Sequence, residues 1–364
     1  MGLRIGVIGT SYGSVIHIPS FQSEGLDVVA VCASRQQSAE TAAKRFGVPH
    51  AFTDYRDLLT LKGMDAVSVV APARLHYPMV MAAIQAGKHV ICEKPFTTNI
   101  EDAFMLWQAA ESSGLTCMLA HEFRFSSGRA FIREQLEDGY IGPLHHVQVS
   151  LMTGSRAGRG EGQPFTGSDD TRQGGGLLWS QGSHYIDCLR HWFGDILSVS
   201  GTVHTHMGQR TNPETGQVIE ATADNAFSAA LEFVNGGWAS LAFSNVAGFG
   251  TGGRIEIYGR DGTLVTPQAS NTSNPPAHGI VLGAKVGADA LALIPIPGRL
   301  QPFIDDRDER MMPMRLLTRE FLRGIQEGLS PSPNFHDGYS VMQVLCAIRQ
   351  SSATGSAVHI NSSL

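Results

Sequence analysis

Residues 3–21 read LRIGVIGTSYGSVIHIPSF, an apolar run that ends at a glycine and continues into a helical pattern. Gly9 follows the apolar run directly, as a tight turn between a buried strand and a helix requires. Ser11 and Ser14 stand where such turns usually carry glycines, and Gly13 supplies flexibility one residue early. Small residues at these places let the backbone approach a phosphate group, whose charge the following helix N-terminus favours.

The first third of the chain repeats this alternation. Apolar strand patterns cover residues 27–33, 65–71, 89–92 and 115–120, and helical patterns separate them at 36–47, 76–87 and 100–114. Continuous apolar strands that alternate with helices predict a parallel sheet covered on both faces. This context favours a dinucleotide-binding Rossmann unit over a plain strand–turn–helix, with its turn at Gly9, Thr10, Ser11, Tyr12 and Gly13.

The pattern changes after about residue 121. A helix over 130–142 precedes alternating runs at 144–152, 225–244 and 253–266, and Gly-containing turns at 235–237 and 261–262 predict hairpins. Two helical patterns, at 314–328 and 338–352, close the chain. We therefore predict an α/β Rossmann domain over 1–121 and an α+β domain with a large, mainly antiparallel open sheet over 122–364. The C-terminal helices are free to pack back on the first domain.

The end of the second strand bears on the cofactor. NAD-binding units place an acidic residue there to bind the ribose 2′-hydroxyl. This chain has Ser34 and Arg35 instead, and a guanidinium suits a 2′-phosphate through forked hydrogen bonds. The alternative is an exposed surface arginine. We predict that NADP is preferred over NAD.

Composition excludes several classes of protein. The 364 residues are 42% hydrophobic and 16% charged with a net charge of −6, which suits a two-domain globular protein and argues against nucleic-acid binding. No apolar run approaches the roughly 20 residues of a membrane span. The five cysteines form no CxxC pair and are expected as buried free thiols in a cytoplasmic protein. His145 and His146 lack ligand spacing, so no metal site is predicted.

An apolar run at 89–92 ends in two opposite charges, Glu93 and Lys94, followed by Pro95. Together with the N-terminal turn, the stretch APARLHYP at 71–78 and the segment QGGGLLWSQGSHYIDCLRHWFGD at 173–195, this CEKP motif resembles the Gfo/Idh/MocA family. The likeness extends over nearly the whole chain, including IEIYGRDGTL at 255–264. It implies an NAD(P)-dependent dehydrogenase or reductase acting on CH–OH groups of sugars, polyols or related small molecules.

The resemblance assigns roles to particular residues. It places Lys94 beside the nicotinamide, contacting the reacting oxygen, with a following peptide bond that is often cis. An ammonium group there stabilises charge on that oxygen or moves a proton. His184 matches the catalytic histidine of the family, and imidazole titrates near neutrality. The expected arrangement places His184 and Ser180 across a cleft from Lys94.

One departure from the family concerns substrate binding. Four residues before His184 the family usually has an aspartate, and this chain has Ser180, which hydrogen-bonds but supplies no charge. Either the protein has different substrates and a proton relay built from Lys94 and His184, or it binds the dinucleotide without efficient chemistry. Asp187 either orients His184 or pairs with Arg190.

Further residues are candidates for contacts. Ala71, Pro72, His76, Glu93 and His121 are expected at the cofactor, although His76 alternatively caps or packs, and His17 is expected to be structural. Arg124 either binds substrate or braces the domain junction. The Gly-rich stretch 153–176 resembles a flap, whose Arg156, Arg159 and Arg172 either meet an acidic substrate or are simply solvated.

Two other functions also agree with the sequence. One is a redox-neutral NAD-dependent glycosidase of the same family type, and the other is a non-catalytic dinucleotide-sensing regulator. The open face of the second sheet is expected to be buried in a homodimer or homotetramer.

Overall fold

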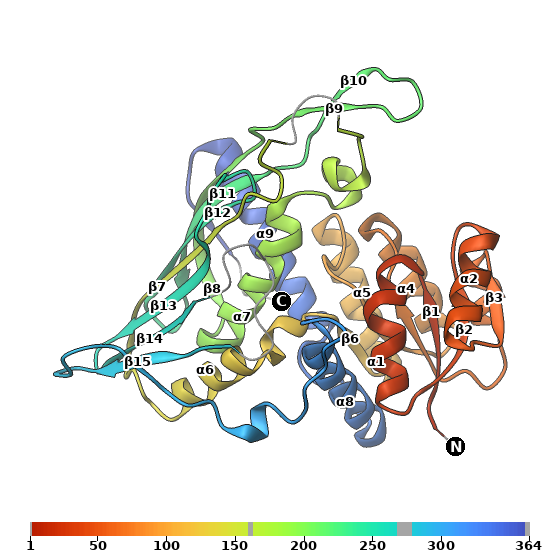
Figure 1. Ribbon diagram of the computed structural model, residues 1–364, viewed down its shortest axis with the longest axis horizontal. Helices are drawn as coiled ribbons and strands as arrows, with labels where there is room; N and C mark the ends of the chain where they lie inside the picture. The colour runs from red at the N-terminus through yellow and green to blue at the C-terminus, as the bar shows by residue number, and fades with distance from the viewer. Residues whose placement is uncertain (1, 159–162, 268–278, 361–364) are drawn as a thin grey trace. The chain divides into compact units, whose positions relative to one another are not determined.

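The computed structural model describes residues 2–158, 163–267 and 279–360 (Figure 1). By its internal contacts the chain divides into two compact units. The first comprises Met1–Glu122 and Asp305–Met342, and the second comprises Phe123–Ile304 and Gln343–Leu364. The first unit therefore contains residues 305–342 in addition to the first domain expected from the sequence.

The sheet of the first unit is parallel, as its apolar strands predict. Among the described residues its strand order is β3-β2-β1-β4-β5-β6, which reverses direction between β1 and β4. In such sheets ligands bind outside the carboxyl ends of the strands at this reversal. Strand β3 is three residues long and not fully buried, so no apolar run marks it in the sequence. The strands are β1 (Arg4–Ile8), β2 (Asp27–Cys32), β3 (His50–Phe52), β4 (Ala66–Val69), β5 (His89–Cys92) and β6 (Cys117–Leu119).

Helices connect these strands, with local signals at their ends. Asn99 caps α5, because its side chain accepts a hydrogen bond from the N–H of Asp102. Gly47 and Gly114 end α2 and α5 in the left-handed region that glycine tolerates. A π-helical turn at Gly13–His17 leads into α1. The helices are α1 (Ile18–Ser23), α2 (Gln36–Phe46), α3 (Tyr55–Leu59), α4 (His76–Gln85) and α5 (Ile100–Ser113).

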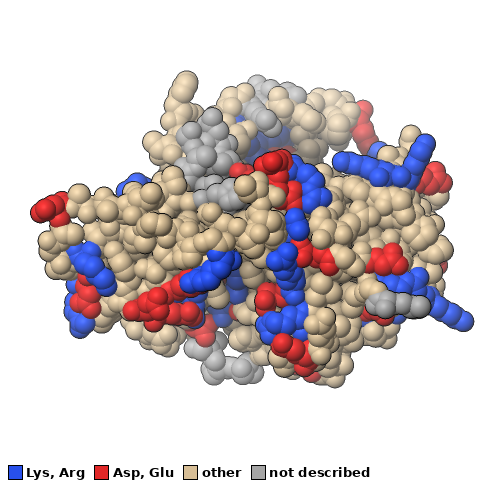
Figure 2. Space-filling model, turned by 60° about the horizontal axis from the view of Figure 1, so that its bottom comes forward, with Lys and Arg blue, Asp and Glu red and all other residues tan. Residues whose placement is uncertain are grey.

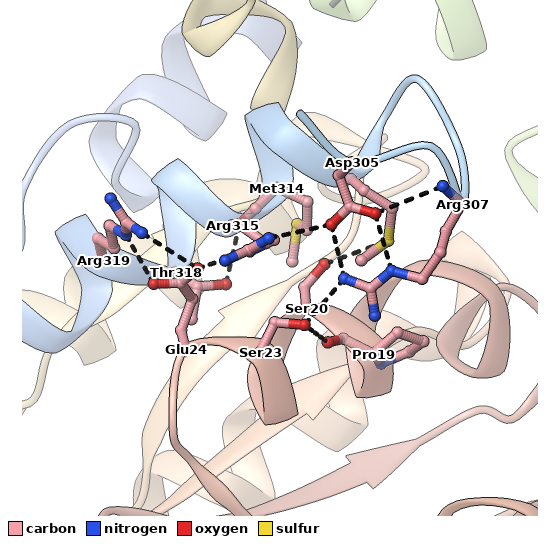
Figure 3. A network of polar contacts seen from close by, with 11 residues as sticks. Pro19, Ser20, Ser23, Glu24, Asp305, Arg307, Met314, Arg315, Thr318 and Arg319 are labelled. Atoms are coloured by element: carbon pink, nitrogen blue, oxygen red, sulfur yellow. Dashed lines mark hydrogen bonds and ion pairs between the residues drawn. The ribbon is translucent and has the colours of Figure 1, made fainter. Parts of the chain in front are cut away.

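The returning segment is tied to the first unit by charge pairs (Figure 3). Glu24, at the end of α1, accepts hydrogen bonds from Arg315 and Arg319 of α8 (Met311–Glu327), each with a nitrogen–oxygen distance of 2.6 Å. Asp305 pairs with Arg315 at 3.1 Å and also with Arg307. Helix α9 (Phe335–Thr354) begins in the same unit. These contacts join segments separated by almost 300 residues of sequence.

The second unit is built on a mixed sheet with strand order β16-β15-β14-β13-β7-β12-β11-β8-β17 over the described residues. Its pairings are antiparallel except for β12 with β7, which confirms a mainly antiparallel sheet. Both predicted hairpins form, β11 with β12 and β13 with β14. The strands are β7 (Leu144–Met152), β8 (Ile196–His204), β11 (Ala226–Phe233), β12 (Trp238–Ser244), β13 (Gly252–Gly259), β14 (Gly262–Pro267), β15 (Leu282–Lys285), β16 (Ala292–Leu293) and β17 (Val358–His359); β9 (Gln209–Thr211) and β10 (Val218–Glu220) pair separately.

One face of this sheet is covered. Buried and exposed positions alternate along β11, where Phe227, Ala229, Leu231 and Phe233 are buried. Helices α6 (Ser127–Glu137) and α7 (Ser183–Phe193) belong to this unit, and a π-helical turn at Leu178–Gly182 leads into α7. Helix α6 begins and ends earlier than predicted, because residues 139–142 form a turn with two positive-φ glycines. Short 3₁₀ turns occur at Ala73–Leu75, Glu122–Phe125, Gly167–Asp169, Thr171–Gln173 and Gly298–Leu300.

The described residues also bear on the cysteines, on membrane-spanning helices, on metal sites and on the surface charge. Cys32, Cys92, Cys117 and Cys188 are buried free thiols, as predicted, and Cys346 is partly buried. Within the described ranges no helix has the length and apolarity to cross a membrane, and no group of three His, Cys, Asp or Glu side chains is arranged to hold a metal ion. On the face drawn in Figure 2, acidic and basic side chains lie among one another.

Candidate active site

The predicted dinucleotide turn follows β1. Gly9 has φ +106°, and a Cβ atom on it would lie 2.3 Å from the carbonyl oxygen of Val70. Only glycine fits this position, because both the backbone conformation and the neighbouring strand exclude a side chain. The helical segment that starts at Ser11 and includes Gly13 carries no acidic residue in its first turn. Its N-terminus can therefore receive an anionic group.

Ser34 and Arg35 follow β2 at the same carboxyl edge of the sheet and are exposed. Arg35 is the N-cap residue of α2, whose first turn contains no acidic residue. Its guanidinium forms no ion pair with any described carboxylate. The nearby Asp54 is engaged, because it caps α3 and pairs with Arg56 at 3.2 Å. A cation without an acidic competitor thus stands at the end of β2.

His76, at the start of α4, is fully buried and bridges two loops. Its Nε2 lies 2.8 Å from the carbonyl oxygen of Ala71, and its Nδ1 lies 3.1 Å and 3.0 Å from those of Pro95 and Phe96. Burial lowers the pKa of this imidazole, and the surrounding carbonyl groups oppose that effect. His76 therefore holds the 71–72 loop against the loop that carries Lys94, in agreement with the packing alternative.

Glu93 and Lys94 leave the end of β5, and the peptide bond between Lys94 and Pro95 is cis. The Oε1 of Glu93 lies 2.9 Å from Nε2 of His17, whose Nδ1 lies 2.9 Å from the hydroxyl of Ser68. The Oε2 of Glu93 accepts the backbone N–H of Lys94 at 3.1 Å. Sequence reasoning expects a structural His17, and the structure shows what it holds: the carboxylate beside Lys94.

Further groups share this edge, and sequence reasoning missed two of them, Glu122 and Arg310. Glu122 and His121 follow β6, and both are buried. Burial, followed by the charges of Glu122 and Glu93, raises the pKa of the Tyr12 phenol. The guanidinium of Arg310 lies 5.2 Å from the ring of Tyr12 and pairs with Asp308 at 2.7 Å. The acidity of Glu122 beside His121 was a visible signal, whereas the approach of Arg310 from a distant segment was not.

In the second unit, His184 lies on α7 and stacks on Phe123, with ring centroids 3.7 Å apart and an interplanar angle of 6°. The histidine is 1% exposed. Ser180 lies one turn earlier, and its hydroxyl donates a hydrogen bond of 2.6 Å to the carbonyl oxygen of Gly176. The serine that replaces the family aspartate thus donates its proton to a backbone carbonyl four residues earlier and supplies no negative charge.

Arg124 forms a buried ion pair with Asp187. Its Nε donates to Oδ2 at 2.8 Å and its Nη2 donates to Oδ1, with side chains 3% and 1% exposed. Arg190 instead pairs with Asp195 at 2.6 Å. This pair lies within the second unit, so both alternatives for Arg124 stay predictions, while Asp187 is engaged by a residue that neither alternative for it named.

Two arginines of the Gly-rich stretch, Arg156 and Arg172, pair with carboxylates. Arg156 donates a hydrogen bond to Asp169 at 2.7 Å. Asp169 also pairs with the buried Arg210 at 3.0 Å. Arg172 pairs with Asp170 at 3.1 Å. Arg159 lies outside the described residues. The ion pairs support a structural role for Arg156 and Arg172 rather than substrate contacts.

Comparison with known proteins decides the family. A family model described as "Oxidoreductase family, NAD-binding Rossmann fold" matches residues 3–121, and one described as "Oxidoreductase family, C-terminal alpha/beta domain" matches residues 133–360. The chain belongs to the Gfo/Idh/MocA oxidoreductase family. Membership confirms the predicted fold class and the prediction of a dehydrogenase or reductase.

Members of this family resemble the chain over most of its length. An uncharacterised oxidoreductase of Synechocystis sp. is 28% identical over 338 residues, which are 92% of this chain and 90% of that protein. Levoglucosan dehydrogenase of Pseudarthrobacter phenanthrenivorans is 25% identical over 391 residues and covers 98% of each chain. A crystal structure of an oxidoreductase domain protein from Kribbella flavida has a TM-score of 0.90 at 25% identity, covering 99% of this chain and 100% of that one.

The residues at the carboxyl edge of the first sheet fit the dinucleotide that the family implies. The Gly9 turn and an acid-free helix start can face a pyrophosphate, and the cation of Arg35 can face a ribose phosphate. The strand order reverses between β1 and β4, next to the Gly9 turn and on the same edge as Arg35, and ligands of such sheets bind at this reversal.

Proposed function

We propose that this family member is an NADP(H)-dependent oxidoreductase that transfers a hydride between the nicotinamide and a hydroxyl or carbonyl carbon of a sugar, polyol or related small molecule. The observation that carries this proposal is the placement of Lys94 at the carboxyl end of β5, on a loop held by the Glu93–His17 hydrogen bond and by His76. The cofactor supplies the hydride acceptor or donor when bound.

The residues of the chain supply proton transfer and charge. The ammonium of Lys94 stabilises negative charge on the substrate oxygen, or donates a proton to it. Where Lys94 acts by its charge alone, His184 takes the hydroxyl proton during oxidation, and its stacking on Phe123 fixes the plane of the ring. Ser180 accepts a hydrogen bond from a substrate hydroxyl in place of the family aspartate.

Named relatives support the substrate class. Levoglucosan dehydrogenase and the scyllo-inositol 2-dehydrogenase (NADP(+)) of Bacillus subtilis, which is 28% identical over 72% of this chain, are named for a sugar derivative and a cyclic polyol. We therefore propose to screen sugars and polyols as substrates, with NADP(H) and with NAD(H), and to monitor each reaction by nicotinamide absorbance. A change in nicotinamide absorbance with any of these substrates supports the proposal, and redox-neutral cleavage of a glycoside would contradict it.

The cofactor preference is tested by Arg35→Ala. Removing the guanidinium should weaken NADPH binding at least tenfold, about 1.4 kcal/mol, and leave NADH binding nearly unchanged, because only NADPH carries the 2′-phosphate. Fluorescence titration of the purified protein with each dinucleotide measures both constants. The matched control is Arg45→Ala on the same helix, where the guanidinium lies over Phe46 at 4.9 Å. Equal losses for NADPH and NADH, or none, would contradict the NADP preference.

We also propose a homodimer or homotetramer formed through the open face of the second sheet. On this face Trp238 is 44% exposed and stacks on His146, with centroids 3.9 Å apart. A hollow of about 490 Å³ lies on the same sheet, lined by small side chains that include Ser200, Ser228 and Ala230. Sedimentation at micromolar concentration should show an oligomer that Trp238→Arg weakens. A monomeric wild-type protein would contradict the proposal.

A further inference from the structure

Two carboxyl groups stand next to each other beside the proposed catalytic lysine. Strands β5 and β6 are parallel neighbours, and the N–H of Ala120 donates to the carbonyl oxygen of Cys92 at 2.8 Å. The residues that follow these strands therefore leave the sheet side by side. Glu93 and Lys94 follow β5, and Glu122 follows β6, where it is 2% exposed.

The two carboxyl groups differ in their hydrogen bonds. Both oxygens of Glu93 are engaged, one by His17 at 2.9 Å and the other by the backbone N–H of Lys94 at 3.1 Å. The Oε2 of Glu122 is buried and has no hydrogen-bond partner among the described residues. A buried carboxylate without partners is unfavourable, whereas a buried carboxylic acid tolerates such a site better. The hydrogen bonds to Glu93 thus stabilise its ionised form, whereas the surroundings of Glu122 favour the neutral carboxylic acid.

The surrounding charges agree with this difference. Burial, and then the charge of Glu93, raise the pKa of Glu122 to about 8, while Lys94 and Arg310 oppose the rise. Burial alone would raise the pKa of Glu93, but the hydrogen bond and charge of His17 and the charge of Lys94 outweigh it, so that pKa is lowered. Tyr12 also faces Glu122 and remains a neutral phenol. Carboxyl groups whose pKa values are driven apart characterise acid–base sites.

We propose that Glu122 is a proton-transfer group that exchanges a proton with Lys94, directly or through one water molecule. This inference rests on the proposed function. In carbonyl reduction the substrate carbon receives the hydride, and its oxygen takes a proton from the Lys94 ammonium. The O–H bond of Glu122 then breaks and its proton restores the ammonium, after which solvent reprotonates the Glu122 carboxylate. In alcohol oxidation the same proton moves in the opposite direction.

The test compares Glu122→Gln with Glu122→Asp. Glutamine preserves shape and neutrality but cannot release a proton, so kcat should fall by about 10²-fold near neutral pH while the dissociation constant for NADPH stays the same. Aspartate keeps an acidic proton and should recover part of the lost kcat. The matched control is Glu40→Gln, an exposed carboxyl on α2 that should leave kcat unchanged. A Glu122→Gln enzyme with wild-type kcat would overturn the proposal.

A second readout does not depend on turnover. The folded protein keeps the Glu122 proton up to about pH 8, whereas the unfolded chain releases it near the usual value of 4.5. Unfolding between these values releases a proton, so rising pH favours the unfolded state. The melting temperature of the wild type should therefore fall relative to Glu122→Gln from about pH 5 to about pH 8 and then run parallel to it.

The outcomes separate this inference from the proposed function. If the wild type turns over no sugar or polyol with either dinucleotide, the proposed function fails and the proton-transfer role fails with it. If the wild type is active but the difference in melting temperature is the same at every pH, Glu122 holds no proton at neutral pH and the proton-transfer role alone is overturned. A growing difference together with a lower kcat supports both.

Discussion

Lys94→Met should lower kcat by about 10²–10⁴-fold while leaving NADPH affinity within about threefold of the wild type. Methionine matches the lysine stem in length but carries no charge and no proton. The substrate oxygen would then develop charge without a neighbouring cation. Steady-state kinetics on the substrate found by screening, together with fluorescence titration of NADPH, measures the two effects separately.

The loop that carries Lys94 should survive this change. Three contacts that hold it use the carboxylate of Glu93, the backbone N–H of Lys94 and the ring of His76 rather than the lysine side chain. The melting temperature of Lys94→Met should therefore match that of the control Lys44→Met, an exposed position on α2. Turnover within tenfold of the wild type would remove Lys94 from the mechanism and favour the non-catalytic regulator.

Asp187→Ala should destabilise the protein by about 3–5 kcal/mol. The carboxylate receives two N–H groups of Arg124, and both side chains are almost completely buried. Removing the acid leaves the buried guanidinium without the counter-charge of Asp187, and that desolvated charge is the main cost. Denaturant unfolding followed by circular dichroism measures the change.

The neighbouring pair of Arg190 with Asp195 provides the control. Its nitrogen–oxygen distance is 2.6 Å, yet the Asp195 side chain is 56% exposed. Asp195→Ala should therefore cost at most about 1 kcal/mol, because water replaces the lost partner. The double variant Arg124→Met with Asp187→Leu removes both buried charges and should regain much of the stability lost in Asp187→Ala. Equal costs for Asp187→Ala and Asp195→Ala would show that the buried pair does not brace the second unit.

Much of the candidate site follows from local patterns. Gly9 is recognisable because a tight turn after a buried strand demands a residue without a side chain, and the structure shows the close approach of Val70 that enforces it. Lys94 is recognisable because a charged pair and a proline end an apolar strand. Ser34 and Arg35 are placed by their position after the second strand. These features depend on residues within a few positions of one another.

Partners that are distant along the chain could not be predicted in this way. The sequence analysis considers Arg190 for Asp187, but the tertiary structure brings Arg124 to it instead. The engagement of Glu93 by His17 joins residues 76 positions apart. Burial likewise depends on the whole fold, so the raised pKa of Glu122 had no counterpart in the sequence.

The sequence by itself determined the alternation of strands and helices, the two kinds of sheet, the glycine turn after the first strand and the charged pair and proline that end a later strand. These follow from periodicity and steric rules that act over a few residues. Only the tertiary structure decided that residues 305–342 join the first unit, that His17 holds Glu93 and that burial raises the pKa of Glu122. Pairing and desolvation depend on which surfaces meet when the chain folds, and local sequence does not specify those surfaces.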